Sequence, residues 1–274
     1  MIDLTAIVLT FNEECNIGDC LESLKDLASR IIVVDSFSTD KTQEICKNFG
    51  VDFFQHEFVN QAQQFEYALK NFNISTKWVI RLDADERLTL KSKNEIESLC
   101  SLHNNDDVNG LVLRFKLFFL GKYLKHGGTY PVRKMVVFKY GFAEIERKNM
   151  DEHIVLLSGK SVECKEDCLH HDCKTIFDWI EKHNKYSNRE VSDFFSNKQT
   201  QLDLLDTKAK RKNKIKNNFY YKLPPGFRAW AYYIFRYYFR FGFLDGKPGK
   251  YYAFLQAYWY RYLVDIKLFE RRIK

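Results

Sequence analysis

The amino-acid sequence predicts an α/β fold with a parallel sheet, followed by a helical C-terminal extension that is rich in basic and aromatic residues. Short apolar runs typical of buried strands alternate with helical patterns through the first hundred residues. Near the other end of the chain, 20 of the 44 aromatic residues lie between Phe219 and Tyr262. Ten Lys or Arg, but no Asp or Glu, lie between Thr207 and Leu244. These observations separate a sheet-forming part from a basic, aromatic part.

Strands and helices are expected to alternate over the first hundred residues. The expected elements, in chain order, are a strand at 5–10, a helix at 16–27, a strand at 31–34, a helix at 42–49, a strand at 51–54, a helix at 61–72 and a strand at 78–82. Such alternation is typical of βαβ units, in which each helix carries the chain back so that successive strands run parallel. The pattern therefore predicts a parallel sheet covered by helices.

Polar residues follow three of these strands at the point where each strand ends. Thr10–Glu14 comes after the first strand, Asp35–Thr42 after the second, and Asp83–Glu86 after the last. The carboxyl ends of parallel strands share one edge of a sheet, and ligands of open α/β sheets bind at that edge. The three segments are therefore expected to meet at a binding site.

The residue types in these segments suggest metal binding. Asp83 and Asp85 form an Asp-x-Asp pair, and two carboxylates at that spacing can share one divalent cation. Ser38, Thr39 or Asp40 could also cap the helix that follows them. Capping alone does not explain three polar strand ends on one edge.

The pattern changes in the second half of the chain. Strands and turns are expected over 110–160, and helix returns over 175–197. A helix is expected over 227–241, and a break at 242–249 separates it from a last helix at 251–272. The helix at 227–241 carries an apolar stripe that either packs in a core or lies at a lipid surface. The stripe consists of Phe227, Trp230, Ala231, Ile234, Phe235, Tyr238 and Phe241.

The composition is that of an ordinary globular protein. The chain has 274 residues, of which 45% are hydrophobic and 29% charged, with only 12 Gly and 4 Pro. These values exclude a disordered or collagen-like chain. No apolar run approaches the roughly 18 to 20 residues of a membrane span, and the apolar start of the chain is too short for a signal peptide. The cytoplasm is therefore the expected compartment.

The seven cysteines bear on the redox state of the protein. An odd number without an export signal favours reduced thiols over a disulfide framework. The segment CKEDCLHHDC at 164–173 leaves two alternatives open, a zinc site or buried free thiols beside a strand. Its spacing lacks a paired CxxC pattern, so free thiols are expected there. The cysteines are Cys15, Cys20, Cys46, Cys100, Cys164, Cys168 and Cys173.

The basic, aromatic segment suits an anionic surface. The net charge of the whole chain is only +7, so the basic excess is local. A lipid headgroup layer and a nucleic-acid backbone both present such a surface. No RNA-binding signature accompanies the segment. An anionic membrane is therefore the expected partner, and nucleic acid is not.

The three polar strand ends resemble a known family. Their motifs, LTFNEE, VVDSFSTDKT and WVIRLDADE, are similar in order and spacing to the nucleotide-sugar domain of glycosyltransferase family 2, the inverting enzymes of the GT-A fold. The later segments MDEH, HHDCKT, EKHNKYS and GFLDGKPG resemble the bacterial branch that adds hexoses to lipopolysaccharide core, capsule or related envelope glycans. The resemblance covers nearly the whole chain.

The resemblance implies a division of the chain. A Rossmann-like GT-A catalytic domain is expected over 1–200, with nucleotide-sugar binding in 1–105 and the acceptor side and catalytic base in 106–200. The helical region over 201–274 is expected to associate with a membrane.

The resemblance also implies roles for individual residues. Those expected to bind the donor are Thr10, Phe11, Glu13, Asp35, Gln64 and Asp83. Asp35 is expected to accept a hydrogen bond from the base, and Asp83 to hold the ribose or a metal-bound water. The family usually has Arg and Asn where this chain has Phe65 and Glu66, so no donor contact is assigned to those two positions.

A divalent metal, Mn²⁺ or Mg²⁺, is the implied cofactor. Asp85 is expected to ligate the ion that bridges the diphosphate, and His170 to contact the metal or the diphosphate. An inverting transfer also needs a carboxylate that deprotonates the acceptor hydroxyl. Asp151 and Glu152 are the candidates for this base, and Glu152 is narrowly favoured.

The sequence thus predicts a metal-dependent inverting hexosyltransferase. It would move a hexose from a nucleoside-diphosphate sugar, with UDP as the expected nucleotide, to a glycan or glycolipid at the inner face of the cell membrane. A nucleotidyltransferase is the enzymatic alternative, but residues 9–16 contain no Gly for a phosphate loop. A basic nucleic-acid-binding protein is the alternative from another class.

Overall fold

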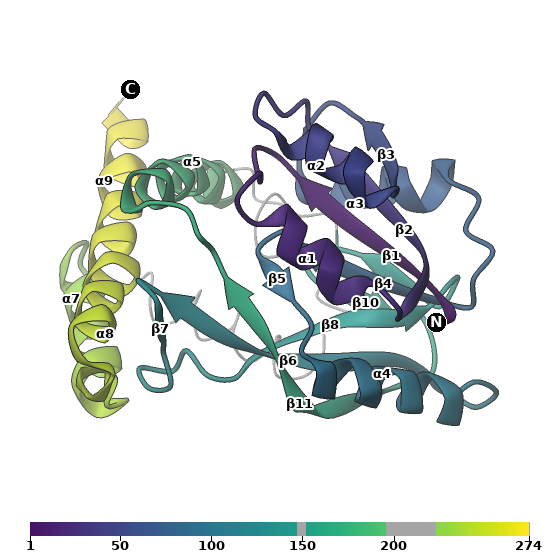
Figure 1. Cartoon of the computed structure of the whole chain (residues 1–274). Helices are drawn as coiled ribbons and strands as arrows, with labels where there is room; N and C mark the ends of the chain where they lie inside the picture. The colour runs from purple at the N-terminus through teal and green to yellow at the C-terminus, as the bar shows by residue number, and fades with distance from the viewer. Residues whose placement is uncertain (147–151, 196–222, 274) are drawn as a thin grey trace. The chain divides into compact units, whose positions relative to one another are not determined.

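The structure, a computed structural model, describes residues 1–146, 152–195 and 223–273 (Figure 1). The predicted domain division after residue 200 lies outside these residues and stays a prediction.

The chain forms two compact units. The first contains the described residues of Met1–Phe118, Pro131–Arg147 and Glu152–Cys173. The second contains those of Phe119–Tyr130 and Lys174–Lys274.

A mixed sheet forms the centre of the first unit. Its strands are β1 (Ile2–Thr10), β2 (Ala28–Asp35), β3 (Asp52–Gln55), β4 (Trp78–Asp83), β5 (Glu86–Arg87), β6 (Val108–Phe119), β8 (Val132–Lys139) and β11 (Lys160–His171). They run in the order β3-β2-β1-β4-β8-β6-β11-β5. β1 pairs in parallel with both β2 and β4, and β2 pairs in parallel with β3. This part of the sheet confirms the predicted βαβ arrangement.

Helices cover both faces of this sheet (Figure 1). They are α1 (Ile17–Leu24), α2 (Thr42–Phe49), α3 (Gln61–Asn71) and α4 (Leu90–Leu102). Leu4, Ala6 and Val8 of β1 share an apolar core with α1, α2 and α4, whereas Ile7 and Leu9 share another with α3. Successive side chains of a strand point to opposite faces, so β1 is buried on both sides.

Two features of these helices differ from the prediction. α1 ends at Leu24 rather than at residue 27, because Asp26 has a left-handed φ of 64° and turns the chain toward β2. α4 was not expected from the sequence. It begins after Thr89, whose side chain forms a capping box with Ser92.

The strands expected over 110–160 are confirmed. β6 and β8 pair antiparallel in the main sheet, while β9 (Ala143–Ile145) and β10 (Ile154–Leu156) form a separate antiparallel pair. β11 was not among the expected strands. It runs parallel to β6 and antiparallel to β5, and this pairing brings the histidines at its end to the residues that follow β4.

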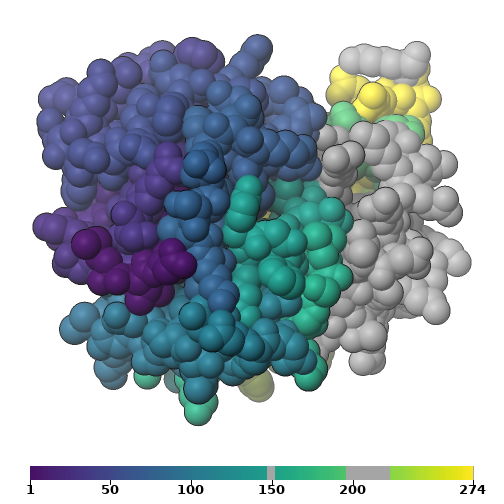
Figure 2. All heavy atoms as spheres, turned by 90° about the vertical axis from the view of Figure 1, so that its right-hand side faces the viewer, coloured from purple at the N-terminus to yellow at the C-terminus, as the bar shows by residue number. Residues whose placement is uncertain are grey.

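The amino and carboxyl ends of β1 lie on opposite sides of the first unit, because the strand runs across it. Figure 2 looks onto the face where the purple start of the chain lies between blue and teal segments. In Figure 1, β1 runs from this face toward the opposite edge. Its carboxyl end at Thr10 therefore lies away from the face seen in Figure 2.

The second unit is mainly helical. Its elements are β7 (Lys122–Tyr123), α5 (Ile176–Phe195), α7 (Phe227–Ile234), a π-helix at Phe235–Phe239, a 3-10 turn at Gly242–Asp245, α8 (Gly246–Tyr252), a π-helix at Ala253–Trp259 and α9 (Tyr260–Ile273). Val191 of α5 packs with Val264 and Leu268 of α9. Arg228 donates to Asp265 in a buried ion pair. These contacts stabilise the unit.

The predicted helices of this region are largely confirmed. α5 fits the expected helix at 175–197, and α7 with its π-helical continuation fits the one at 227–241. The last helix begins at Gly246 rather than at residue 251. Pro248 lies in its first turn, where a missing backbone N–H removes no helical hydrogen bond.

The apolar stripe at 227–241 is largely exposed. Phe227, Trp230, Phe235, Tyr238 and Phe241 are each about half exposed, at 49–55%. The buried side of α7 consists instead of Arg228 and Ala229. In the part of the chain that is described, no helix is both long and apolar enough to cross a membrane.

Candidate active site

The register of the parallel strands brings the three polar strand ends together. Thr10 at the end of β1 pairs with Asp35 at the end of β2, and Leu9 pairs with Asp83 at the end of β4. The expected meeting of these segments at one sheet edge is therefore confirmed. The candidate site lies wholly within the first unit.

Asp35 fastens the ends of β1 and β2. Its buried carboxylate accepts hydrogen bonds from Thr10 Oγ1 at 3.0 Å, the Ser38 backbone N–H at 2.8 Å and Gln55 Nε2 at 3.2 Å. The Ser38 hydroxyl also donates to it. All of these donors are uncharged groups of the chain.

The loops that follow β1 and β2 are joined by further hydrogen bonds. Asn12, whose φ is 53°, donates its backbone N–H to Ser38 Oγ at 2.8 Å. Its side-chain oxygen accepts from the Thr39 N–H at 2.8 Å. The Glu13 N–H donates to Thr42 Oγ1 at 2.9 Å. The two loops therefore form one hydrogen-bonded unit at the sheet edge.

The predicted capping of α2 is formed in part, by Asp40 from the position before the N-cap. Lys41 occupies the N-cap position without a side-chain cap bond. Asp40 instead accepts from the N–H of Thr42, the first helical residue, and from the N–H of Glu14 in the neighbouring loop. Its carboxylate is therefore shared between the start of α2 and the loop after β1.

Two aromatic rings are exposed on these loops. Phe11 follows β1 and is 50% exposed, and Phe37 follows β2 and is 55% exposed. Apolar rings that stay in solvent beside a polar strand end offer flat surfaces on which a planar ligand could stack. Of the two, only Phe11 was among the expected donor-binding residues.

Gln64 lies beneath the same loops. Its side chain is buried and donates from Nε2 to Ser36 Oγ at 3.1 Å and to the His56 carbonyl at 3.0 Å. Its Oε1 lies 2.8 Å from His56 Nδ1. Gln64 therefore supports the loop after β2 from within α3.

The segment after β4 is held by ion pairs. Asp83 Oδ1 lies 3.4 Å from Arg81 Nη2, and its Oδ2 lies 3.6 Å from Lys134 Nζ. Burial alone would raise the pKa of Asp83, but Arg81 and Lys134 lower it below its usual value. Asp83 is therefore an anion between two cations.

Glu86 lies beneath this segment and is almost fully buried. Its carboxylate accepts from the Asp83 N–H at 3.1 Å and pairs with Lys134. Burial raises the pKa of Glu86, and Lys134 opposes that rise. Lys134 thus contacts both Asp83 and Glu86.

Pairing of β5 with β11 places His170 beside Asp85. His170 lies opposite Glu86 in the antiparallel register, and the His171 N–H donates to the Asp85 carbonyl at 2.9 Å. His170 Nε2 lies 3.4 Å from Asp85 Oδ2. Burial would lower the pKa of His170, but the Asp85 carboxylate raises it above its usual value.

The Asp85–His170 pair fits part of a divalent metal site. One carboxylate oxygen and one imidazole nitrogen suit Mn²⁺, and Mg²⁺ is commonly bound through one or two carboxylates together with substrate phosphates. Within the described ranges, no group of three or more His, Cys, Asp or Glu forms a complete metal cluster. The remaining ligands would therefore have to come from a bound phosphate or from water.

Glu152 reaches the same site through Arg81. Its side chain is 7% exposed, and Oε1 lies 3.6 Å from Arg81 Nη2. Arg81 therefore lies within ion-pair distance of both Glu152 and Asp83. Asp151, the other candidate for the base, lies outside the described residues.

The Cys/His segment at 164–173 divides into two environments. Cys164 and Cys168 are buried free thiols, as expected. Cys173 instead forms a disulfide with Cys15, so the expectation of reduced thiols throughout is wrong for this pair. The two cysteines are 158 residues apart, and their pairing depends on the tertiary fold rather than on local spacing.

Two cations of the site were not identified from the sequence. Arg81 lies within the apolar run WVIRL. A cation in such a run is expected to be buried and to need an anionic partner, so the sequence did contain an indication of its role. Lys134 directly follows another basic residue, Arg133, near the start of β8 and gave no comparable signal. The basic residues that hold the carboxylates were thus less visible than the carboxylates themselves.

Comparison with known proteins is consistent with this geometry. Residues 5–156 match the family described as glycosyl transferase family 2. A lipopolysaccharide core biosynthesis glycosyltransferase of Rhizobium meliloti is 26% identical over 273 residues, covering 93% of this chain and 91% of its own. An uncharacterized glycosyltransferase of Rickettsia typhi is 25% identical over 202 residues, covering 70% of this chain and 68% of its own.

A solved structure agrees over almost the whole length. A mannosyltransferase of Pyrobaculum calidifontis, solved with GDP-Man and Mn²⁺, covers 98% of this chain and 88% of its own, with a TM-score of 0.58 and 14% identity. This likeness supports the predicted GT-A fold with a helical C-terminal region. Because the family match covers more than half of the sequence, the chain belongs to glycosyl transferase family 2.

Proposed function

We propose that this glycosyltransferase is an inverting, metal-dependent hexosyltransferase that uses a nucleoside-diphosphate sugar. The observation that carries the proposal is the position of Arg81, within 3.4 Å of Asp83 and 3.6 Å of Glu152. Asp83, a proposed donor-binding carboxylate, and Glu152, the candidate base, are therefore neighbours of the same guanidinium. Asp85 lies two residues after Asp83, and the pairing of β11 with β5 places His170 beside Asp85.

The donor is proposed to bind at the ends of β1 and β2. Phe11 would provide a ring for the base, and Glu13 would lie beside it on the same loop. Asp35 would accept a hydrogen bond from the base in place of the one from Gln55, which is its most distant protein donor at 3.2 Å. Thr10 and Gln64 are engaged with the chain itself, so their proposed role is to hold the pocket in shape.

Asp83, Asp85 and His170 are proposed to bind the ribose and the diphosphate end of the donor. Asp83 would contact the ribose, while Asp85 and His170 would hold the divalent metal. When bound, such an ion neutralises negative charge that develops on the departing nucleoside diphosphate. Arg81 and Lys134 add positive charge to the same region from the chain itself.

Glu152 is proposed to act as the general base. Its carboxylate would accept the proton of the acceptor hydroxyl while that oxygen attacks the anomeric carbon opposite the leaving diphosphate, which inverts the configuration. The ion pair with Arg81 would keep the carboxylate in position. Asp151 remains the alternative base.

A bacterial envelope glycan or a lipid-linked precursor is the proposed acceptor. Support comes from the relative in Rhizobium meliloti, which is named for lipopolysaccharide core biosynthesis and aligns over 93% of this chain. A panel of nucleotide sugars tests the proposal. We expect one UDP- or GDP-hexose to raise the melting temperature only with Mn²⁺ or Mg²⁺, because a ligand that binds the native state stabilises it.

The same panel separates binding from transfer. Glu152→Gln should retain the donor-induced thermal shift but lose transfer to a deacylated lipopolysaccharide core acceptor. Absence of a shift with every nucleotide sugar, with or without metal, would contradict the proposed function.

The second unit is proposed to hold the enzyme on the inner face of an anionic membrane. The half-exposed rings of Phe227, Trp230 and Tyr238 support this, since aromatic side chains favour the membrane interface. The basic run at 208–216 would add about 1 kcal/mol of attraction per charge near such a surface, although it lies outside the described residues.

Liposome flotation tests the membrane proposal. The protein should float with anionic but not with neutral vesicles. Replacing Lys210, Arg211, Lys212 and Lys214 with Glu should release it. If the wild type stays at the bottom of the gradient in the presence of anionic vesicles at low salt, the proposal is contradicted.

A further inference from the structure

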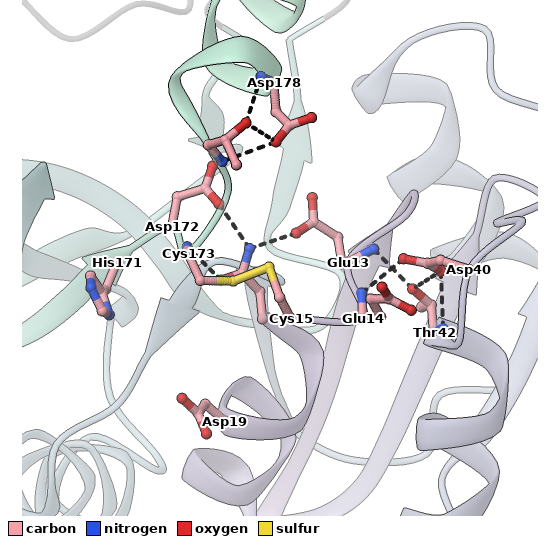
Figure 3. The surroundings of a disulfide bond; sticks show 12 residues. Glu13, Glu14, Cys15, Asp19, Asp40, Thr42, His171, Asp172, Cys173 and Asp178 are labelled. Atoms are coloured by element: carbon pink, nitrogen blue, oxygen red, sulfur yellow. Dashed lines mark hydrogen bonds between the residues drawn. A yellow bond between two sulfur atoms is a disulfide. The ribbon is translucent and has the colours of Figure 1, made fainter. Parts of the chain in front are cut away.

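A disulfide joins two loops of the candidate site. Cys15 lies two residues after Glu13 on the loop that follows β1, and Cys173 lies three residues after His170 beyond the end of β11. Figure 3 shows the bond between them, with the carboxylates of Glu13 and Asp172 on either side. The disulfide therefore connects the loop proposed to bind the donor with the segment proposed to bind the metal.

Asn16 joins the same two loops by hydrogen bonds. Its buried side chain donates from Nδ2 to Glu13 Oε2 at 2.8 Å and to Asp172 Oδ1 at 2.9 Å. Its Oδ1 accepts from the Cys173 N–H at 3.1 Å. The Asn16 amide and the disulfide thus join the same two loops, and the amide also holds the Glu13 carboxylate.

The disulfide differs from the other cysteines in its exposure. Cys15 and Cys173 are both exposed, whereas Cys20, Cys46, Cys100, Cys164 and Cys168 are buried. Burial raises the pKa of Cys46 and of Cys100 to about 12. Thiol exchange needs an accessible sulfur and a thiolate. A reductant in solution therefore reaches the Cys15–Cys173 bond, and a disulfide reagent added afterwards reaches these two cysteines rather than the five buried thiols.

We propose that the Cys15–Cys173 disulfide is a reversible redox latch on the donor site, an inference that rests on the function proposed above. With the bond formed, the loop at 11–16 is fixed covalently to the segment at 170–173. With the bond reduced, the hydrogen bonds of Asn16 still join them but no covalent bond does. The loop then gains conformational freedom that nucleotide binding must remove, which weakens the affinity.

The reducing agent for this latch is a dithiol. One of its thiolates attacks a sulfur of the disulfide, the S–S bond breaks, and a mixed disulfide forms while the released cysteine thiolate takes up a proton. The second thiol of the reductant then attacks the mixed disulfide. The protein ends with two thiols and the reductant with one disulfide, a transfer of two electrons.

The test compares oxidised and dithiothreitol-reduced wild-type protein. Reduction should make two thiols per chain reactive toward an aromatic disulfide reagent under native conditions. It should also accelerate backbone hydrogen exchange in residues 11–16 and 170–173. The affinity for UDP or GDP, measured with Mn²⁺ by calorimetry, should fall about fivefold or more.

The matched control is the Cys15→Ser/Cys173→Ser variant. It should resemble reduced wild type in exchange and affinity, and dithiothreitol should change neither. Because both cysteines are exposed, the substitutions remove no core packing. Thermal melting of the variant checks that it is folded, and the reduced wild type gives the same comparison without any substitution.

The outcomes separate the latch from the proposed function. Equal hydrogen exchange in the oxidised and reduced forms, or the lack of two newly reactive thiols, overturns the latch. Different exchange with equal nucleotide affinity overturns its coupling to the donor site. If exchange differs but neither UDP nor GDP binds either form, the proposed donor function fails while the redox-dependent order of the loops stands.

Discussion

The two halves of the candidate site are held by different chemistry. At the ends of β1 and β2, the carboxylates of Asp35 and Asp40 accept hydrogen bonds from uncharged N–H and O–H donors. At the end of β4, Asp83 and Glu86 instead face the cations Arg81 and Lys134. We call these the neutral half and the charged half of the site.

This difference indicates what each half can do. Neutral donors satisfy the carboxylates of the neutral half and fix the shape of its loops. In the charged half, positive side chains surround carboxylates that a bound cation or diphosphate could also contact, so the charge balance can change when a ligand binds. Substitutions should therefore affect chemistry in the charged half and loop order in the neutral half.

The largest expected effect comes from Asp85→Ala in the charged half. Removing this proposed metal ligand should lower kcat by about a hundredfold to a thousandfold, because the leaving diphosphate loses its counter-charge. Steady-state transfer assays with Mn²⁺ measure the effect. Asp40→Asn is the matched control in the neutral half and should change kcat by less than about twofold. Full turnover in excess chelator would contradict the assignment.

The next effect is that of Glu152→Gln. Loss of a general base should lower kcat by about a hundredfold or more, with little change in donor affinity because the amide keeps the size of the carboxylate. Single-turnover rates and donor calorimetry measure the two quantities. If Asp151→Asn lowers kcat in this way and Glu152→Gln does not, the base is Asp151.

The neutral half could be anticipated better than the charged half. The polar strand ends were visible because strand, turn and helix signals are local, and parallel register then places Thr10 beside Asp35 without further information. Glu152 and Lys134 reach the charged half from other parts of the chain. Such long-range contacts leave no periodic signal in a single sequence.

The same limit explains the two clearest surprises. The Cys15–Cys173 bond spans 158 residues, so counting cysteines does not reveal it. The stripe at 227–241 shows which residues share a helix face, but helical spacing does not say what covers that face. In the structure, the buried side of α7 is formed by Arg228 and Ala229 because Arg228 pairs with Asp265 on α9.

A smaller effect, on stability, should follow from Lys134→Met. Glu86 is almost fully buried, and removing its cation leaves a buried charge without that partner. We expect the free energy of unfolding to fall by about 2 kcal/mol, measured by urea unfolding at neutral pH. The double variant Lys134→Met/Glu86→Gln should recover most of this loss. A double variant as unstable as the single one would show that packing of the lysine, rather than charge, causes the effect.

The smallest effect should be the pH dependence of Asp40 in the neutral half. Burial would raise the pKa of Asp40, but hydrogen bonds from Thr42 and Glu14 lower it below its ordinary value of 3.8. A carboxyl whose pKa is lower in the folded state stabilises the fold above the unfolded value and loses that contribution as the pH falls through the folded value. The difference in unfolding free energy between wild type and Asp40→Asn should therefore be constant from neutral pH down to about pH 5 and shrink below about pH 4. Urea unfolding at a series of pH values measures it, and a difference that stays constant into strong acid would show that Asp40 acts through its shape rather than its charge.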